Sequence, residues 1–211
     1  PKARCFSWTL AVWKFVSNSK APEKQENKIG GFEDMEKIKW GVLGCAGIAA
    51  EQTIPAMQQA ENAELYGIAS RGLEKAKAFQ KRFGFAKAYD SYEALLDDPQ
   101  VQAVYIPLPN SLHGEWVRKA AAKGKHVLCE KAFTVNAEQA QKLFDLAKEK
   151  KLLITEAIWT RYMPSRKMIN DIIESGVIGE VTAVTANLSY TVSHVERIRK
   201  PELAGGALLD V

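Results

Sequence analysis

The side chains best suited to chemistry in this chain lie in four short clusters, each directly after an apolar run. The first follows Ile38–Leu43 and fits the pattern G-x-G-x-x-G/A, reading Gly44, Cys45, Ala46, Gly47, Ile48 and Ala49. Such a pattern supplies a tight turn, a close backbone approach to a pyrophosphate, and helix N–H groups that attract phosphates. The cluster predicts a dinucleotide-binding loop. The alternative, a plain glycine-rich turn, is disfavoured because the loop joins the first strand to the first helix.

The second cluster, Ser70 and Arg71, follows the second apolar run. A site for NAD usually holds Asp or Glu at this point, where the carboxylate binds the ribose 2′-hydroxyl. Here the first acid is Glu74, whereas a hydroxyl and a guanidinium suit a 2′-phosphate. Lys75 adds a further positive charge. The cluster predicts NADP(H), with NAD possible, and the alternative is that Arg71 is only a solvated residue at a helix start.

The third cluster follows the fourth apolar run, where strand order reverses in sheets that bind dinucleotides. It contains Pro107 and Leu108, then Asn110, which we expect to cap the next helix, and His113. His113 could face a nicotinamide, and a structural surface histidine is the alternative. Because ligands bind at this point of such sheets, the cluster is predicted to lie along the cofactor crevice.

The fourth cluster is Glu130-Lys131, directly after the apolar run His126–Cys129. A lysine at a buried strand end beside a glutamate has reason to have a shifted pKa. Such a lysine can hold or shuttle the proton that accompanies hydride transfer to a carbonyl. Taken without the other clusters, the pair would be interpreted as an ordinary surface Glu–Lys pair.

The elements that must position these clusters alternate regularly. Strands are predicted at 38–43, 64–69, 86–89, 102–107, 126–129 and 152–157. Helices are predicted at 47–59, 73–83, 91–96, 113–123 and 136–150, with Pro55 kinking or shortening the first and with Ser91 and Asn136 as N-caps. Six strands alternating with helices predict an α/β fold, a Rossmann doubly wound parallel sheet of order 3-2-1-4-5-6.

The pattern changes after the sixth strand. A helix is predicted at 165–175, a turn at 176–179, and a long strand at 181–190. We expect three segments: 1–34 as an extension or linker, 35–157 as the nucleotide-binding domain, and 158–211 as the beginning of an incomplete α+β domain. Met35 stands just before the first strand, so we expect the natural protein to begin there.

Composition excludes several functional classes. The net charge is only +4, and lysine and arginine are interleaved with acids, so no basic stripe predicts a nucleic-acid partner. No apolar run approaches the ~20 residues of a membrane span. Three cysteines without a C-x-x-C spacing favour neither a disulfide framework nor a metal site. The expected compartment is therefore the cytoplasm.

Together with the stretches 156–165 and 204–211, these clusters resemble the Gfo/Idh/MocA oxidoreductase family. The last two stretches are most similar to its dimeric dihydrodiol dehydrogenase / D-xylose dehydrogenase branch. The resemblance implies a Rossmann domain followed by an open β-sheet domain, a homodimer, and NADP-dependent hydride transfer to or from a sugar, polyol or cyclic diol. It also implies that Lys131 lies near the reacting carbon, that Trp159 and Arg161 contact the nicotinamide end, and that Asp210 is a catalytic acid.

Two departures from the family pattern matter. Ala132 stands where the family has proline after the lysine, so the peptide bond is either trans with Lys131 displaced, or cis and held by its surroundings. The family's proton-donating Tyr or His falls just after the position of Val211. We expect an N-terminal portion of the enzyme, and the alternative is a catalytically inactive NADP-binding fragment or nucleotide sensor.

Overall fold

The computed structural model describes residues 37–192 and 194–206. The predicted extension at 1–34 and the predicted acid Asp210 lie outside these residues. Within the described part of the chain, no helix is long and apolar enough to cross a membrane.

Parallel strands in the order β3-β2-β1-β4-β5-β6 form one sheet, which confirms the predicted order. The strands are β1 (Ile38–Leu43), β2 (Ala63–Ala69), β3 (Lys87–Tyr89), β4 (Ala103–Ile106), β5 (His126–Cys129) and β6 (Ile154–Glu156). β4 is buried along its whole length, as expected for a central strand covered by helices on both faces.

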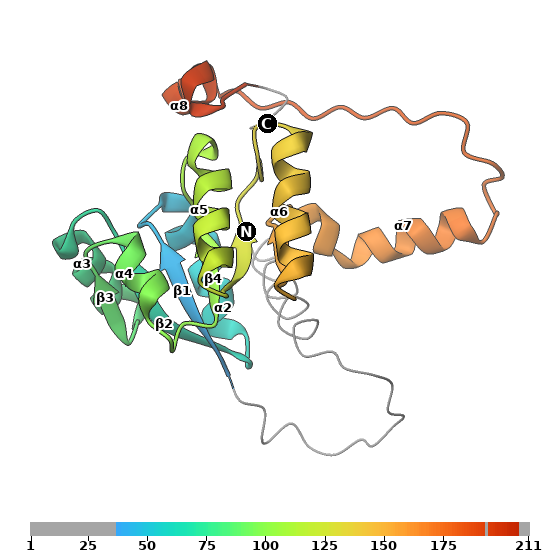
Figure 1. Ribbon diagram of the computed structural model, residues 1–211. Coiled ribbons are helices and arrows are strands. Elements are labelled where there is room, and N and C mark those ends of the chain that lie inside the picture. Colours follow the sequence, from blue (N-terminus) through green and yellow to red (C-terminus); the bar gives the residue numbers. More distant parts are fainter. Residues whose placement is uncertain (1–36, 193, 207–211) are drawn as a thin grey trace, which may run out of the picture.

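Helices cover both faces of the sheet (Figure 1). One face packs on the π-helical turn η1 (Ala49–Thr53), α2 (Ile54–Gln59) and α3 (Leu73–Phe83). The other face packs on α4 (Tyr92–Asp97), α5 (Asn110–Ala122) and α6 (Ala137–Glu149). These two layers place every βα connection of the sheet at its carboxyl edge, where the four clusters lie.

The first helix lies where it was predicted, but part of it is π-helical rather than α-helical. It is helical from Gly47 to Gln59, with the π-helical turn directly before α2. Pro55 has no N–H, and its ring would crowd the carbonyl four residues earlier in a regular helix. The wider turn accommodates the proline without breaking the helix, and it carries the buried Thr53.

The predicted caps are partly correct. Ser91 and Asn136 accept hydrogen bonds from the backbone N–H groups of Ala94 (3.3 Å) and Gln139 (2.9 Å), as expected of N-caps. The prediction for Asn110 is wrong, because α5 begins at Asn110 itself and Pro109 is its N-cap. The Asn110 side chain instead donates to the carbonyl of Ala204 (3.2 Å), far along the chain.

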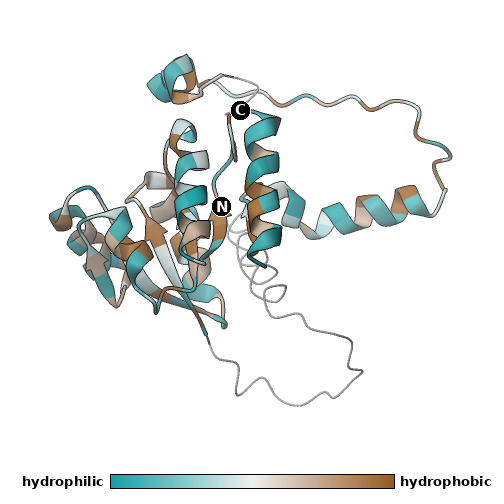
Figure 2. Cartoon of the chain, in the orientation of Figure 1, coloured by the Kyte–Doolittle hydropathy of each residue, from teal (hydrophilic) through white to brown (hydrophobic). Residues whose placement is uncertain are grey.

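Beyond β6 the chain forms η2 (Trp159–Tyr162), α7 (Pro164–Glu174), α8 (Glu196–Arg199) and η3 (Pro201–Leu203). α7 confirms the predicted helix and points away from the sheet (Figure 1), with an apolar side that includes exposed Met168 and Ile172 (Figure 2).

The predicted strand at 181–190 is wrong, since these residues run as an exposed chain that pairs with no described strand. Alternating side chains favour a strand, but a strand also needs a neighbour to accept its backbone hydrogen bonds. The described part of the chain offers none to this segment.

Candidate functional site

Gly44 ends β1 and turns the chain into the phosphate loop. Its φ of +111° lies in the region that favours glycine, and its N–H donates to the carbonyl of Ala69 at 2.9 Å. A Cβ at this position would lie 3.0 Å from Cδ2 of Leu108. The first position of the predicted fingerprint is therefore one that needs glycine.

The rest of the loop opens the first helix. Ala46 accepts the N–H of Ala50 at 3.1 Å, while Gly47 and Ile48 are exposed at the helix start. Ala49 is fully buried against the sheet. The loop thus presents an accessible helix N-terminus at the sheet edge, where N–H groups without intrahelical partners attract phosphates.

Cys45 joins the loop to the second cluster. Its thiol lies 3.7 Å from the carbonyl oxygen of Lys75 and hydrogen-bonds the side chain of Ser70. Burial raises the pKa of the Cys45 thiol, and the nearby Lys75 charge and the Ser70 hydrogen bond oppose that rise. Ser70 is buried, whereas the Lys75 side chain is exposed. The predicted pyrophosphate and 2′-phosphate residues therefore share one corner of the sheet.

Tyr92, which the sequence analysis missed, lies in the same corner. Its hydroxyl is 3.6 Å from where a Gly44 Cβ would stand, and its ring packs edge-on against Trp116 with centroids 4.9 Å apart. Burial raises the pKa of Tyr92, while the positive charge of exposed Arg71 acts against that rise. The signal available in sequence was its place directly after the N-cap Ser91, in a helix that begins at the same edge.

Most residues of the third cluster are buried. Pro107 is buried, Leu108 touches the phosphate loop, and Asn110 holds the Ala204 carbonyl as described above. His113 has no exposed surface, and its ring nitrogens lie 2.6 Å and 2.7 Å from the carbonyl oxygens of Ala132 and Leu108. The alternative interpretation of His113 as a surface histidine is wrong, because the ring is buried and both of its nitrogens face backbone carbonyls. Its predicted contact with the cofactor remains a prediction.

The fourth cluster is built on two buried hydroxyls that the sequence analysis did not single out. Tyr105 of β4 donates to Oε1 of Glu130 at 2.6 Å, and Thr53 donates to the Tyr105 oxygen at 2.9 Å. The Lys131 N–H donates to Oε2 of the same carboxylate at 3.3 Å. Burial raises the pKa of Glu130, while the hydrogen bonds and the charges of Lys131 and Arg197 oppose that rise.

The loop after Glu130 contains a cis peptide bond between Lys131 and Ala132. The structure therefore has the second of the two geometries considered for alanine in place of the family's proline. On the other side of the edge, Trp159 is half-buried against the core on the α2 face, and Arg161 is exposed. Their predicted contacts with a nicotinamide remain predictions.

Residues 38–157 match the family model for GFO_IDH_MocA, described as an oxidoreductase family with an NAD-binding Rossmann fold. The chain belongs to this family. The match covers the whole sheet and confirms the resemblance inferred from the motifs.

Named relatives are similar over most of this chain. A D-xylose 1-dehydrogenase (NADP(+)) from Haloferax volcanii is 42% identical over 82% of this chain, and a dTDP-3,4-didehydro-2,6-dideoxy-alpha-D-glucose 3-reductase from Actinomadura kijaniata is 40% identical over 82%. A crystal structure of a 3-ketoreductase from Actinomadura kijaniata with TDP-benzene and NADP superposes with a TM-score of 0.63 and 42% identity, covering 69% of this chain and 46% of that one. The chain spans about half the length of the curated relatives it matches, 54% and 52%.

Proposed function

We propose that this chain binds NADP(H) at the carboxyl edge of its sheet and forms the cofactor-binding part of a sugar-modifying oxidoreductase. The observation that carries the proposal is the corner where glycine-requiring Gly44, an accessible helix start and Arg71 meet. Ser70 and Arg71 stand at the end of β2, where an NAD site usually holds an acid. NADP is also the cofactor in the name of the xylose dehydrogenase and in the crystals of the 3-ketoreductase.

The residues present fit this cofactor. The N–H groups at Gly47 and Ile48 would hold the pyrophosphate, and Arg71 with Lys75 would bind the 2′-phosphate through charge-assisted hydrogen bonds. The nicotinamide half would then extend across β4 toward Glu130, because dinucleotides bind across the crevice where strand order reverses. When bound, the cofactor supplies or accepts the hydride.

Lys131 would hold the proton that is exchanged with the substrate oxygen, since it follows a buried strand end at the carboxyl edge. We further propose that residues 158–211, including Asp210, begin the part of the protein that binds substrate and forms a homodimer. The expected substrate is a sugar, polyol or cyclic diol, and the named activities of the relatives on xylose and on a dTDP-linked sugar support that class.

The cofactor assignment is tested by titrating the purified chain with NADPH and with NADH. Replacing Arg71 with alanine removes a charge-assisted contact of roughly 1.5–3 kcal/mol, so NADPH affinity should fall about 10- to 100-fold while NADH affinity stays nearly constant. Arg82→Ala is the matched control, because Arg82 is exposed at the other end of α3. Equal wild-type affinity for the two cofactors would contradict the assignment.

Activity is tested separately, with NADPH or NADP⁺ and a panel of aldoses, ketosugars and diols. Turnover that is lost in Lys131→Ala, while NADPH still binds, would support the enzyme reading. Tight NADPH binding without turnover on any member of the panel would favour a protein that binds the nucleotide without catalysis.

A further inference from the structure

A line of buried hydroxyls crosses the centre of the molecule and ends on Glu130. Thr53 and Tyr105 have no exposed surface, and Glu130 is only 7% exposed. The three side chains come from the π-helical turn, β4 and the connection after β5, and around them the core on this face is apolar. Buried polar groups are costly unless they are hydrogen-bonded, so such a line needs a structural or functional explanation.

The two hydrogen bonds of this line run in the same direction, toward Glu130. Tyr105 donates to Oε1 of Glu130, as an ionised carboxylate there requires, and the Tyr105 oxygen accepts from Thr53. Both O–H dipoles therefore point their positive ends toward the carboxylate, and aligned hydrogen bonds strengthen one another. The line stabilises negative charge on Glu130 and fixes where that charge lies.

The carboxylate also faces two positive charges. Lys131 is its neighbour in the chain, and the charge of Arg197 comes from the short helix α8. A glutamate with free rotamers would turn toward such cations. The short 2.6 Å bond from Tyr105 instead ties one carboxylate oxygen to the sheet, which leaves Glu130 as a positioned counter-charge beside both cations.

The position matters because of what the crevice is proposed to hold. In the sheet, β4 lies between β1 and β5. The phosphate loop follows β1 and Glu130 follows β5, so the two stand on either side of β4 at the carboxyl edge. The nicotinamide ring is positively charged when oxidised and neutral when reduced. A negative charge near the ring thus favours the oxidised form, whereas Lys131 and Arg197 alone would disfavour it.

We propose that Thr53 and Tyr105 are positioning residues that hold Glu130 as a fixed negative charge beside the nicotinamide, so that the site binds NADP⁺ more favourably relative to NADPH than it would without them. The inference rests on the proposed cofactor. It predicts a property of binding equilibria, which can be measured without a known substrate.

The experiment measures the dissociation constants of NADP⁺ and NADPH for the full chain by calorimetry, and compares their ratio between variants. Glu130→Gln keeps the shape and removes the charge, so the ratio Kd(NADP⁺)/Kd(NADPH) should rise about fivefold, which corresponds to about 1 kcal/mol. Tyr105→Phe should shift the ratio in the same direction by about two- to threefold, and Thr53→Val by less.

Tyr66→Phe is the matched control, because it removes a tyrosine hydroxyl from β2, which β1 separates from β4, and its partner is Asp98 rather than Glu130. Its ratio should equal that of the wild type. A merely structural role for Tyr105 would weaken both cofactor forms alike and leave the ratio unchanged, which would overturn the inference. If Tyr105→Phe does not fold, Glu130→Gln and Thr53→Val provide the same comparison.

The outcomes separate this inference from the proposed function. A wild-type chain that binds neither form contradicts the proposed cofactor and the inference with it. Binding of both forms with the same ratio in wild type, Glu130→Gln and Tyr105→Phe contradicts the inference alone.

Discussion

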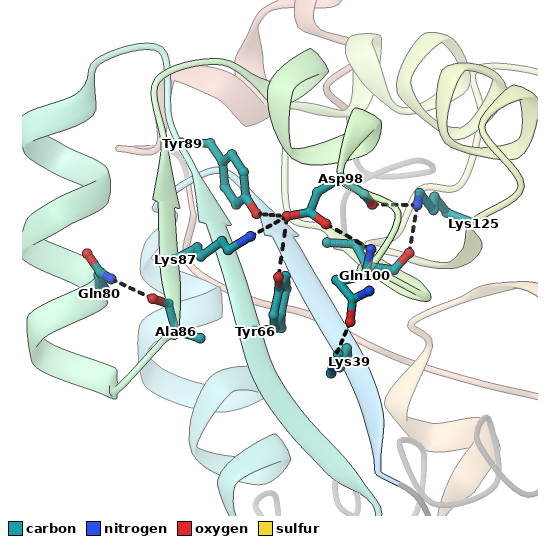
Figure 3. Close-up of polar contacts among 10 residues, drawn as sticks. Lys39, Tyr66, Gln80, Ala86, Lys87, Tyr89, Asp98, Gln100 and Lys125 are labelled. Carbon is teal, nitrogen blue, oxygen red and sulfur yellow. Dashed lines mark hydrogen bonds and ion pairs between the residues drawn. The ribbon is translucent and has the colours of Figure 1, made fainter.

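Replacing Asp98 with alanine should destabilise the fold without touching the proposed cofactor site. Asp98 ends α4, and one of its carboxylate oxygens accepts hydrogen bonds from Tyr89 (2.7 Å), Lys87 (2.9 Å) and Tyr66 (3.4 Å) (Figure 3). The other oxygen accepts the backbone N–H of Gln100 at 2.8 Å. A single side chain therefore joins β2, β3 and the loop that leads into β4.

The loss of stability in Asp98→Ala depends on which hydrogen-bond partners of Asp98 cannot bond to water once the carboxylate is gone. Lys87 is half exposed, so water substitutes for its ion pair and we assign it no share. The hydrogen bonds from the partly buried Tyr89 and from the Gln100 amide are the two that water does not easily replace. Losing a hydrogen bond of this kind costs about 1–1.5 kcal/mol. The expected loss is about 2–3 kcal/mol, which lowers the Tm by about 4–12 °C for a chain of this size.

Thermal unfolding of Asp98→Ala and of Asp97→Ala tests this estimate. Asp97 is the matched control, since it is an exposed neighbouring acid whose ion pair with Lys123 should contribute less than about 1 kcal/mol. Equal midpoints for the two variants would refute the reasoning.

The same comparison has a pH dependence. Burial alone would raise the pKa of Asp98, but the hydrogen bonds from Tyr89, Lys87 and Gln100 outweigh it and hold the pKa well below its usual range. A carboxyl whose folded pKa is depressed contributes its full stability above the unfolded pKa of about 3.9, and loses it as the pH falls toward the folded value. The difference between wild type and Asp98→Ala should thus be largest near pH 7 and should shrink below about pH 4.

Two further predictions concern the phosphate loop and the N-terminus of α6. Gly44→Ala places a Cβ at a φ of +111° and 3.0 Å from Leu108, and strain of about 1–3 kcal/mol in the phosphate loop should reduce NADPH affinity by about 5- to 150-fold. Gly72→Ala, where a Cβ meets nothing within 4 Å, should leave the titration unchanged. Asn136→Ala removes the N-cap of α6 and should lower stability by about 1 kcal/mol in a thermal melt, whereas Asn136→Ser should restore most of it.

The parts of the fold that sequence reasoning predicted correctly depend on interactions between near neighbours. The capping bond of Ser91 spans three residues, and Gly84 ends α3 in the left-handed conformation that a C-cap requires. The order of the sheet follows as well, because short right-handed crossovers leave few ways to arrange alternating strands and helices. The phosphate loop belongs to this group, since strand, turn and helix start are contiguous in the chain.

The parts that were missed depend on partners far apart in sequence. Tyr105 looked like one more apolar residue of a buried strand, and only its approach to Glu130, 25 residues later, shows its hydroxyl in use. Thr53 needed the π-helical turn to lie beneath that hydroxyl. Residues 181–190 have the alternating apolar and polar side chains of a strand, but no described strand pairs with them. The pattern is present, and the predicted strand is not.

The polar residues of the cluster after β4 hold loops of the site together. An asparagine and a histidine at a carboxyl edge were both predicted to bind cofactor. In the structure the Asn110 side chain donates to the carbonyl of Ala204, and the His113 ring lies between the carbonyls of Leu108 and Ala132. His113 thus ties the loop after β4 to the loop that carries Lys131. Contact of either residue with a cofactor remains a prediction. The need to join two loops at the crevice is enough to explain the polar residues of this cluster, without direct contact with a ligand.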